Sequence, residues 1–302
     1  MKLEGLWDKQ ILLLGWEINM KKFITTVMSL AILVVNSITV FADDSKTIYG
    51  DYAIKNEYLE MKQLQLESAS KLKKMGLTST EIDEIKSLDV DEEYSKHIYS
   101  LKDYSESELE KFNYTDKQIE LIKNFNGEIE ELTLLGASCK TYISKTSYSY
   151  SNQYTKAVLN FSFKWSGVPY FKYNDCLTFA WNNGLYVDKS KSYLNVTYKG
   201  RYDSTMKQKA TQNILSTGDA GVNYTFPVDI GTMNVSEGSG VVYLDKKANI
   251  VEIGTRVEYG HREVTGTPSA SVSIGGGISG SVGISFDKKT KSISYNTARF
   301  KR

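Results

Sequence analysis

Residues of the types that perform catalysis are few in this chain, and their spacing forms no catalytic motif. The sequence holds two histidines, His97 and His261, which are 164 residues apart. It contains no HExxH zinc motif, no GxSxG nucleophile elbow and no phosphate-binding loop. The glycines at 275–277 lie between strand-like segments and not before a helix, so they predict no nucleotide site. We therefore predict that the protein is not an enzyme and needs no cofactor.

The histidines and acidic residues also predict no metal site. His97 lies among Lys and Tyr residues, and we interpret it as a solvent-exposed side chain. His261 falls on the inward parity of a strand pattern, which is typical of a buried core residue. The acidic run at 89–93 lacks the glycine and the ligand spacing of a calcium-binding EF-hand loop.

Two cysteines, Cys139 and Cys176, make an even pair. In an exported chain, an even pair permits one disulfide, which would close a loop of 38 residues. Closing such a loop stabilises a fold by about 4 kcal/mol in the chain-entropy model. Two reduced, buried thiols are the alternative interpretation. We expect the disulfide, because exported proteins fold in an oxidising compartment.

Tyrosines and arginines of the second half are the candidate binding residues. Tyrosine rings suit the apolar faces of ligands, and the two arginines share a charged face of their strand that suits water. The candidates are Tyr148, Tyr150, Tyr154, Tyr170, Tyr173, Arg256 and Arg262. Trp165 and Trp181 alternate in phase with Leu and Phe neighbours, so we assign both to the core.

Charge divides the chain into two halves of opposite sign. Residues 43–138 carry 12 Lys and Arg against 22 Asp and Glu, whereas residues 139–302 carry 21 against 11. An asymmetry of this size indicates a charged partner. The acidic and basic halves could dock on each other, or each could meet its own partner. The basic half predicts association with an anionic cell-surface polymer or a membrane surface, and we expect no nucleic-acid partner.

The acidic half contains a repeat of capped helices. Thr78 and Thr115 lie at equivalent positions 37 residues apart, and each is followed three residues later by Glu81 or Gln118. This spacing is the capping box, in which the threonine and the N3 side chain satisfy backbone N–H groups reciprocally. Ser105 begins a third unit of the same kind. The pattern predicts several short helices joined by tight turns.

The basic half changes to a two-residue alternation with Gly, Asn and Asp turns, which is typical of antiparallel strands. We predict a segregated α+β fold, in which a short helical domain is followed by a β-sandwich of about eight or nine strands. Residues 203–216 are expected to form a short helix or an irregular crossover. The strands are expected at 139–150, 159–165, 177–181, 191–199, 222–228, 239–246, 249–262, 269–286 and 291–298.

The longest alternation, over residues 270–286, places Ala, Val, Ile, Phe and Gly on one parity and Ser and Gly on the other. It resembles the membrane-inserting hairpins of β-pore-forming toxins, although a spanning strand needs roughly 9–11 residues and this run gives less than one full pair. The preceding strand has a charged face, and a turn at residues 266–269 would fold it back onto the alternating one. We therefore favour an antiparallel hairpin of the sandwich.

The amino terminus predicts export. Lys21 and Lys22 precede a mostly apolar stretch that ends in Val40-Phe41-Ala42, which is the pattern of a secretory signal peptide cleaved after Ala42. The expected divisions of the chain are a gene-call extension at 1–19, the signal peptide at 20–42, an acidic helical domain at 43–127, a connector at 128–138 and the basic β-sandwich at 139–302.

The lysine-rich signal peptide, the excess of Lys over Arg and the L-x-x-M-G-[LY]-[ST]-type capped repeats resemble secreted two-part proteins of low-GC Gram-positive bacteria (Firmicutes). Many of those proteins are uncharacterised, so the resemblance implies export and brings no activity with it. Our first hypothesis is a secreted, non-enzymatic protein that binds an anionic cell-surface polymer, a lipid headgroup or a protein. The alternatives are a membrane-damaging toxin with an acidic shielding pro-region and an exported hydrolase with an unrecognised site.

Overall fold

The computed structural model describes residues 47–151, 153–202, 204–215, 220–264, 266–274 and 281–301. All of them belong to one compact unit, Lys46–Arg302. The expected gene-call extension, signal peptide and cleavage site lie outside the described residues. None of the described helices is long and apolar enough to cross a membrane.

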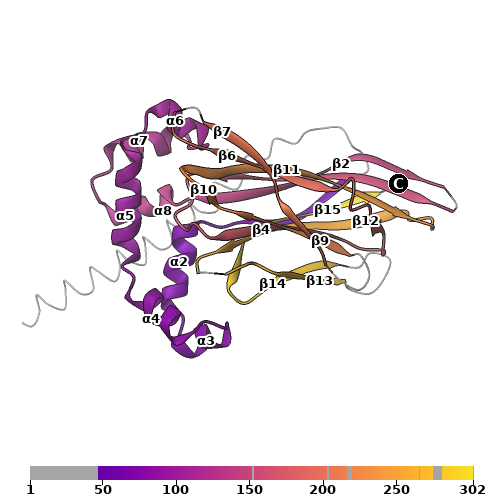
Figure 1. The fold of residues 1–302 in the computed structure, drawn as a ribbon, viewed down its shortest axis with the longest axis horizontal. Helices are drawn as coiled ribbons and strands as arrows, with labels where there is room; N and C mark the ends of the chain where they lie inside the picture. Colours follow the sequence, from indigo (N-terminus) through magenta and orange to yellow (C-terminus); the bar gives the residue numbers. More distant parts are fainter. Residues whose placement is uncertain are drawn as a thin grey trace, which may run out of the picture. The chain divides into compact units, whose positions relative to one another are not determined.

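Seven short helices gather at one end of the strands in the described residues (Figure 1). They are α2 (Glu57–Leu66), α3 (Ala69–Lys74), α4 (Ser79–Ser87), α5 (Val90–Leu101), α6 (Glu106–Lys111), α7 (Asp116–Asn124) and α8 (Ile129–Leu135). The three predicted capping boxes are confirmed at Thr78, Ser105 and Thr115. At the last of these, the Gln118 backbone N–H donates to the Thr115 hydroxyl and the Thr115 N–H donates to the Gln118 side-chain oxygen.

The helices enclose a core of their own. Leu72, Ile98, Leu109 and Ile122 are fully buried in it. Leu132 of α8 is also fully buried there, so residues 129–135, within the segment expected to be a connector, form a helix that packs with this group. We call residues 57–135 the helical region.

Loss of a capping threonine is expected to weaken this region. Thr115→Ala should lower the free energy of unfolding by about 1 kcal/mol, because one N–H of the first turn of α7 loses its acceptor. Thr80→Ala is the matched control: Thr80 is exposed in the first turn of α4 and caps no helix, so its replacement should change stability by less than about 0.5 kcal/mol. Urea unfolding of both variants measures the difference, and equal losses would contradict the capping role.

Antiparallel strands form two large sheets and one small one. The six-stranded sheet has the order β1-β15-β12-β4-β9-β8, the seven-stranded sheet has the order β2-β3-β11-β6-β7 with β5 and β10 added on β11, and β13 pairs only with β14. The strands are β1 (Thr47–Ile54), β2 (Ser138–Tyr150), β3 (Thr155–Ser166), β4 (Asn174–Trp181), β5 (Tyr186–Val187), β6 (Tyr193–Lys199), β7 (Thr205–Lys209), β8 (Thr211–Ile214), β9 (Gly221–Pro227), β10 (Asp229–Ile230), β11 (Met233–Lys246), β12 (Glu252–Arg262), β13 (Ala270–Ile274), β14 (Val282–Phe286) and β15 (Thr290–Lys301).

Aromatic side chains fill the space between the two large sheets. Trp165 and Trp181 are fully buried there, which confirms their assignment to the core. The rings of Phe161 and Phe179, from opposite sheets, stack with centroids 5.1 Å apart. The Trp165 indole N–H donates to the Tyr259 hydroxyl at 3.0 Å, so the polar edge of this buried ring is satisfied.

The predicted segregated α+β class is confirmed. The structure differs from the sequence-based expectations in how segments that are distant in the sequence pair with each other. The described part of the acidic segment begins with strand β1, which pairs with β15 at the other end of the sequence. Four of its eight residues are exposed in succession, so its burial does not alternate and its sequence carries no strand period. The segment 203–216, expected as a helix or crossover, contains β7 and β8, two short strands that each lie at an edge of a sheet.

The expected pairing of β12 with the alternating segment is wrong. Strand β12 pairs with β4 on one side and with β15 on the other, so neither of its edges is free. The alternating segment instead forms its own two-stranded sheet, with Val272 opposite Ile284. This sheet lies outside the two large ones in Figure 1.

The expected disulfide is also absent, since Cys139 and Cys176 are both free and buried. Cys139 on β2 belongs to the core between the sheets. Cys176 on β4 alternates with Leu177, which also lies in that core, so the Cys176 thiol lies on the opposite, outward side of the six-stranded sheet. Burial raises the pKa of both thiols well above the usual value, and the nearby Asp175 carboxylate adds to the effect.

Candidate functional site

The outward face of the seven-stranded sheet carries two rows of side chains that sequence order does not reveal. The register places Lys140 opposite Lys164, and Lys164 opposite Glu237 on the next strand. Thr197 and Lys207 complete this row across β6 and β7. Neighbouring strands lie about 4.8 Å apart, so the two adjacent lysines project side by side.

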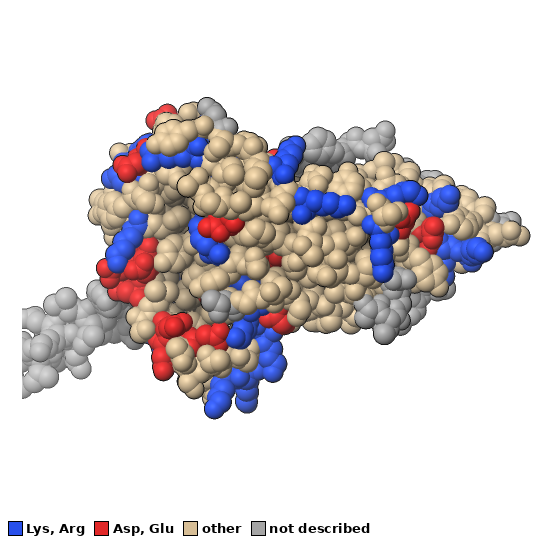
Figure 2. All heavy atoms as spheres, in the orientation of Figure 1, with Lys and Arg blue, Asp and Glu red and all other residues tan. Residues whose placement is uncertain are grey.

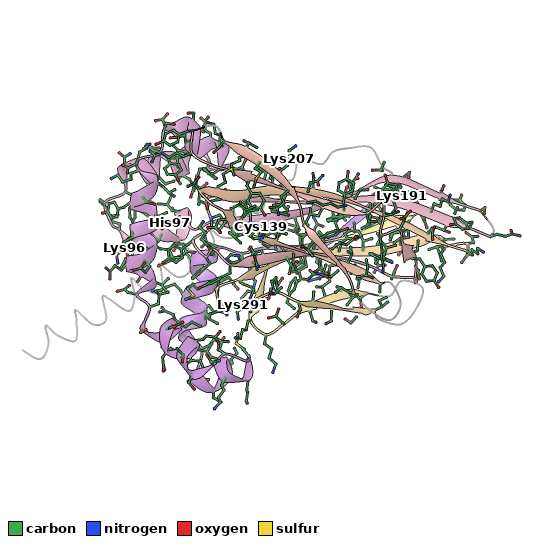
Figure 3. All side chains as sticks on the ribbon, viewed as in Figure 1. Lys96, His97, Cys139, Lys191, Lys207 and Lys291 are labelled. Atoms are coloured by element: carbon green, nitrogen blue, oxygen red, sulfur yellow. The ribbon has the colours of Figure 1, made fainter. Side chains whose placement is uncertain are left out.

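The second row lies two residues further along each strand. It consists of Tyr142, Ser162, Ser239, Asn195 and Lys209. We name the two rows together the lysine face: four lysines, one exposed tyrosine and a strip of hydroxyl and amide groups, with Glu237 as their one carboxylate. Figure 3 labels Lys207 on β7, at the margin of this face.

Among the described residues, Glu237 opposite Lys164 is the one carboxylate on the lysine face, so four ammonium groups there share a single negative charge. In the described part of the protein, none of its four lysines forms an ion pair, although Lys140 Nζ lies 5.2 Å from the centre of the Tyr142 ring. Like charges directly opposite each other destabilise a sheet, and here Lys140 and Lys164 occupy such positions. In the view of Figure 2, red side chains gather mainly over the helical end and blue ones extend along the sandwich.

Three predicted tyrosines lie near the β2–β3 turn and are already engaged. The Tyr148 hydroxyl donates to the Ile250 carbonyl, and the Tyr154 hydroxyl donates to Asp245 at 2.9 Å. Tyr150 is 37% exposed and packs its ring against Tyr148. They are therefore not part of the lysine face.

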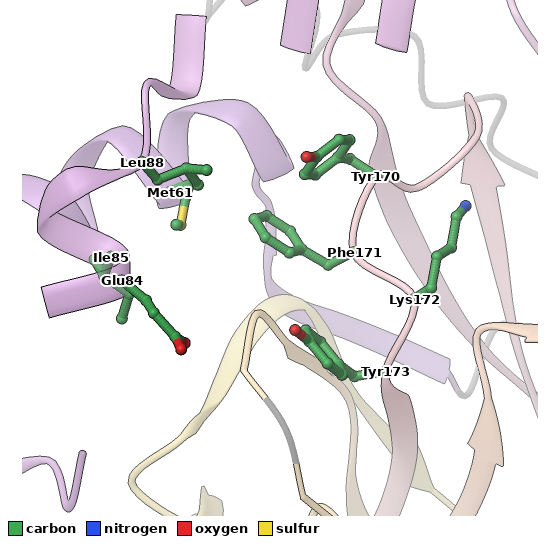
Figure 4. Close-up of a pocket in the computed structure, with 8 residues that line it drawn as sticks. All are labelled: Met61, Glu84, Ile85, Leu88, Tyr170, Phe171, Lys172 and Tyr173. Carbon is green, nitrogen blue, oxygen red and sulfur yellow. The ribbon is translucent and has the colours of Figure 1, made fainter. Parts of the chain in front are cut away.

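Tyr170 and Tyr173 line a groove of about 490 Å³ between the helical region and the loop before β4. In Figure 4, both rings lie across the opening from Met61 and Leu88, whereas the Lys172 ammonium points away from these helical residues. The Tyr170 hydroxyl donates to Glu93 at 3.1 Å, and burial together with this carboxylate raises the pKa of Tyr170 to about 12. The groove lining is completed by Glu84, Ile85 and Phe171.

The two predicted arginines each pair with an acidic residue, Arg256 with Glu258 and Arg262 with Asp287, but only Arg262 is buried. Arg256 pairs with Glu258 at 2.6 Å and lies over the Tyr295 ring. Arg262 is 3% exposed and donates to the Thr267 carbonyl at 2.9 Å. The expectation that the charged face of β12 meets water is therefore wrong for Glu258 and Arg262, which are buried, whereas Glu252 and Arg256 stay partly exposed.

A buried chain of ionisable groups joins the helical region to the sandwich. Glu57 of α2 contacts His261 Nε2 at 2.9 Å, and Asp175 of β4 contacts His261 Nδ1 at 2.8 Å. The Tyr259 hydroxyl donates to the same Asp175 carboxylate at 2.8 Å. Glu57 also accepts the Tyr170 backbone N–H at 2.8 Å. We name Glu57, Asp175, Tyr259 and His261 the junction network.

Charge in the junction network is balanced by protonation of His261. Burial alone would lower the pKa of His261, but the Asp175 and Glu57 carboxylates outweigh it and hold this pKa well above its usual value. Burial likewise opposes ionisation of Glu57, yet the bond from His261 leaves the pKa of Glu57 below its usual value. All of these side chains are nearly inaccessible to solvent, so the network is structural, and the prediction that His261 is a buried core residue is confirmed.

His97 differs from its expected exposure. It is half-buried, and its Nε2 lies 3.0 Å from the Val168 carbonyl oxygen. Burial and the nearby Lys172 ammonium lower the pKa of His97 to about 4, so the ring is neutral at physiological pH. The described residues contain no group of three or more His, Cys, Asp or Glu side chains placed to hold a metal ion.

Sequence reasoning missed the lysine face because its members come from β2, β3 and β7. A partial signal exists in the spacing of Lys207 and Lys209, which puts both ammonium groups on one side of a strand. The alternation around Lys164 also predicts that this side chain points away from the core. That these three lysines and Lys140 share one face follows only from the strand order.

No protein-family model matches the chain, and no curated protein matches it in sequence. Among solved structures, similar folds include a collagen-binding domain from a Staphylococcus aureus adhesin, with 11% identity, a TM-score of 0.26 and coverage of 48% of this chain and 95% of that one. The pilus backbone RrgB of Streptococcus pneumoniae has 10% identity, a TM-score of 0.30 and coverage of 54% and 50%. Clostridium perfringens delta-toxin has 7% identity, a TM-score of 0.23 and coverage of 55% and 85%.

Proposed function

We propose that the protein binds an anionic polymer through the lysine face, as a non-enzymatic secreted protein. The observation that supports this function most directly is the set of four lysines, Lys140, Lys164, Lys207 and Lys209, brought onto one sheet face without a described counter-ion. A repeating anion would relieve the repulsion between Lys140 and Lys164 and would gain charge-assisted hydrogen bonds.

The neighbours of the lysines favour a polymer that also bears hydroxyl groups. Ser162, Ser239 and Asn195 lie in one row beside Lys209, and their side chains donate to and accept from hydroxyls. Tyr142, 41% exposed, ends the row and offers an aromatic face for a sugar or polyol carbon chain. Ligands of this class are acidic polysaccharides and polyol phosphates.

A second feature suits a long ligand. Lys207 and Lys209 are two residues apart on β7, so their side chains emerge about 7 Å from each other along the strand. Lys140 and Lys164 lie across the sheet from them, about three to four strand spacings of roughly 4.8 Å away. A flexible chain with repeated charges can meet both lysine pairs at once, whereas one small anion meets only one pair.

Neutralising the lysine face should abolish most of the binding. The variant Lys140→Ser, Lys164→Ser, Lys207→Ser, Lys209→Ser is expected to raise the Kd for alginate about 100-fold or more, because each lysine near an anionic surface contributes about 1 kcal/mol. Binding is measured by titration at low salt, and the wild-type affinity should fall as NaCl is raised.

The control variant replaces four exposed lysines elsewhere: Lys73, Lys74, Lys189 and Lys247. It changes the net charge by the same amount, so it separates a site from a general effect of charge. We expect its Kd to rise less than about tenfold, a change of roughly 1.4 kcal/mol. Equal losses in the two variants, or no alginate binding by the wild-type protein at low salt, would contradict the proposed function.

A further inference from the structure

The groove lined by Tyr170 and Tyr173, which we name the tyrosine groove, has an apolar interior. Met61 of α2 and Ile85 of α4 lie on its helical side, and Phe171 points toward Met61 from the other side in Figure 4. These three residues are only 2%, 3% and 8% exposed. Pockets that bind small molecules measure roughly 300–1,000 Å³, and this groove of about 490 Å³ lies within that range. Its interior therefore suits an apolar stem.

One carboxylate without a partner reaches this interior. In Figure 4 the Glu84 side chain extends from α4 into the opening, and no described residue forms an ion pair or a hydrogen bond with its carboxylate. By contrast, Glu81 of the same helix pairs with Lys289 at 2.8 Å. Glu93 of α5 pairs with Lys96, also at 2.8 Å. The charge of Glu84 is therefore left for a cation from outside the described residues.

A hydroxyl lies across the groove from this carboxylate. Tyr173 comes from the wall opposite α4, and its hydroxyl points into the opening in Figure 4. This hydroxyl forms no hydrogen bond with any described residue. A carboxylate only accepts hydrogen bonds, and a tyrosine oxygen can accept as well as donate. Glu84 and Tyr173 together therefore suit a cation that carries N–H donors, and the aromatic ring attracts its charge as well.

The lysine in the wall of the tyrosine groove does not neutralise Glu84. In Figure 4 the Lys172 ammonium points away from the helical residues. It donates to the Asn234 side-chain oxygen at 2.7 Å and also to the Pro169 carbonyl. The opening of the groove therefore keeps its negative charge.

Hydrogen bonds hold both walls of the tyrosine groove in place without a ligand. Glu57 accepts the backbone N–H groups of Tyr170 at 2.8 Å and of Phe171 at 3.0 Å, which fixes the loop before β4. Gln65 of α2 donates to the Ile85 carbonyl at 2.9 Å, which fixes the end of α4. Because the walls are already ordered, a ligand binds without the entropic cost of ordering them.

The charge of the helical region favours a basic macromolecule over a small amine. Residues 57–135 carry 10 Lys and no Arg against 19 Asp and Glu. An excess of this size attracts a positively charged partner and orients it during encounter. A small amine would need only the one carboxylate of Glu84, whereas a basic polypeptide meets the charge of the whole region.

We propose that the tyrosine groove binds a lysine side chain of an extended, basic polypeptide. The methylene stem of the lysine packs on Met61 and Phe171, as long charged side chains commonly do on apolar surface. Its ammonium then donates to the Glu84 carboxylate and the Tyr173 hydroxyl. This activity is independent of polymer binding by the lysine face, which repels a basic partner and lies on the seven-stranded sheet.

Calorimetric titration of the intact protein with the peptide acetyl-(Lys-Ala)4-amide at low salt tests the role of Glu84. Glu84→Gln should raise the Kd about tenfold, because the bound ammonium loses its counter-ion. The matched control, Asp83→Asn, removes the same charge from the neighbouring exposed position, which does not line the groove. It should raise the Kd less than about twofold. Equal losses in the two variants would overturn the proposal.

Two further probes separate the stem, the charge and the polypeptide. A peptide with Nε-acetyl-lysine keeps the stem but not the charge, so its Kd should be at least about tenfold higher. Free n-butylamine has the stem and the charge without the polypeptide, and it should also bind at least about tenfold more weakly than the peptide. Equal affinity of the acetylated peptide, or of n-butylamine, would overturn a lysine of a polypeptide as the occupant.

Carbodiimide coupling locates the bound lysine on the protein. The reagent activates a carboxylate, and an adjacent amine then forms an amide with it, so that water is lost overall and taken up by the carbodiimide. Mass spectrometry should find the peptide joined to Glu84 and not to Asp83. Coupling that is equal at the two positions, or absent from Glu84, would overturn the proposal.

Discussion

His261→Leu is expected to lower the free energy of unfolding by about 3–5 kcal/mol, because it removes the cation from between two buried carboxylates. Glu57 and Asp175 are both inaccessible to solvent, so neither can recover hydration while the protein stays folded. The leucine fills a similar volume, so the loss reports charge and hydrogen bonding and not a cavity. Urea unfolding at pH 6 measures it.

The pH dependence of this loss follows from two shifts of opposite sign. The pKa of His261 is raised in the folded protein, so its contribution is complete below the ordinary value of 6.5 and disappears as the pH rises through the folded pKa. The pKa of Glu57 is lowered, so its contribution is complete above 4.5 and disappears as the pH falls through the folded pKa. The deficit of His261→Leu should therefore be largest between about pH 4.5 and 6.5.

The other histidine is the natural control. His97 is neutral and bonded to one carbonyl, so His97→Leu should cost only about 1 kcal/mol, the typical value of a single hydrogen bond. If His261→Leu were no more harmful than His97→Leu, the junction network would not hold a charged imidazole.

Glu263→Gln is expected to stabilise the protein by about 2–3 kcal/mol at pH 8. Glu263 is 4% exposed, and neither of its carboxylate oxygens has a hydrogen-bond partner among the described residues. Burial raises the pKa of Glu263 from 4.5 to about 7. The folded protein therefore carries a cost for ionising this carboxyl, which is absent below pH 4.5 and complete above about pH 7. A neutral glutamine never incurs it.

Urea unfolding of the wild-type protein and of Glu263→Gln at pH 8 and at pH 5 tests whether the gain in stability depends on pH in this direction. The advantage of Glu263→Gln should shrink strongly at pH 5, where the folded wild-type side chain is protonated. Glu120→Gln, at an exposed position on α7, should change stability by less than about 0.5 kcal/mol at either pH. A gain from Glu263→Gln that is equal at the two pH values would contradict ionisation as its cause.

Local chemistry made the helical region predictable. Each capping box uses residues three positions apart, so the sequence alone contains both partners of Thr115 and Gln118. The alternation that placed Trp165 and Trp181 in the core is similarly local. The capping boxes predict helices and the two-residue alternation predicts strands, and together they predict the fold class.

Contacts between distant segments were not predictable in this way. Glu57 and His261 are separated by 204 residues, and nothing near either one identifies the other as a partner. The lysine face needs the order of β2, β3, β11, β6 and β7, which a single sequence does not supply. The two thiols failed to pair for the same reason: their spacing permits a loop, but the strands direct them to opposite sides of a sheet.

The alternating segment shows the limit of periodicity. A two-residue period predicts that β13 and β14 are strands with one apolar side, and this is confirmed. It does not specify what the apolar side covers. The surface that it covers is polar and includes Thr178 and Asn223, which lie on the outward faces of β4 and β9. The pattern therefore predicts the strands but not the surface on which they rest.

Lysine acetylation in the presence and absence of alginate tests the central claim most directly, because it locates the polymer on the intact protein. Bound polymer should slow acetylation of Lys140, Lys164, Lys207 and Lys209 together, by about tenfold at saturation, since a shielded ammonium is removed from reagent and solvent. Lys73, Lys74, Lys189 and Lys247 should react at unchanged rates. Protection confined to that second group, or spread evenly over both groups, would contradict the lysine face as the binding site.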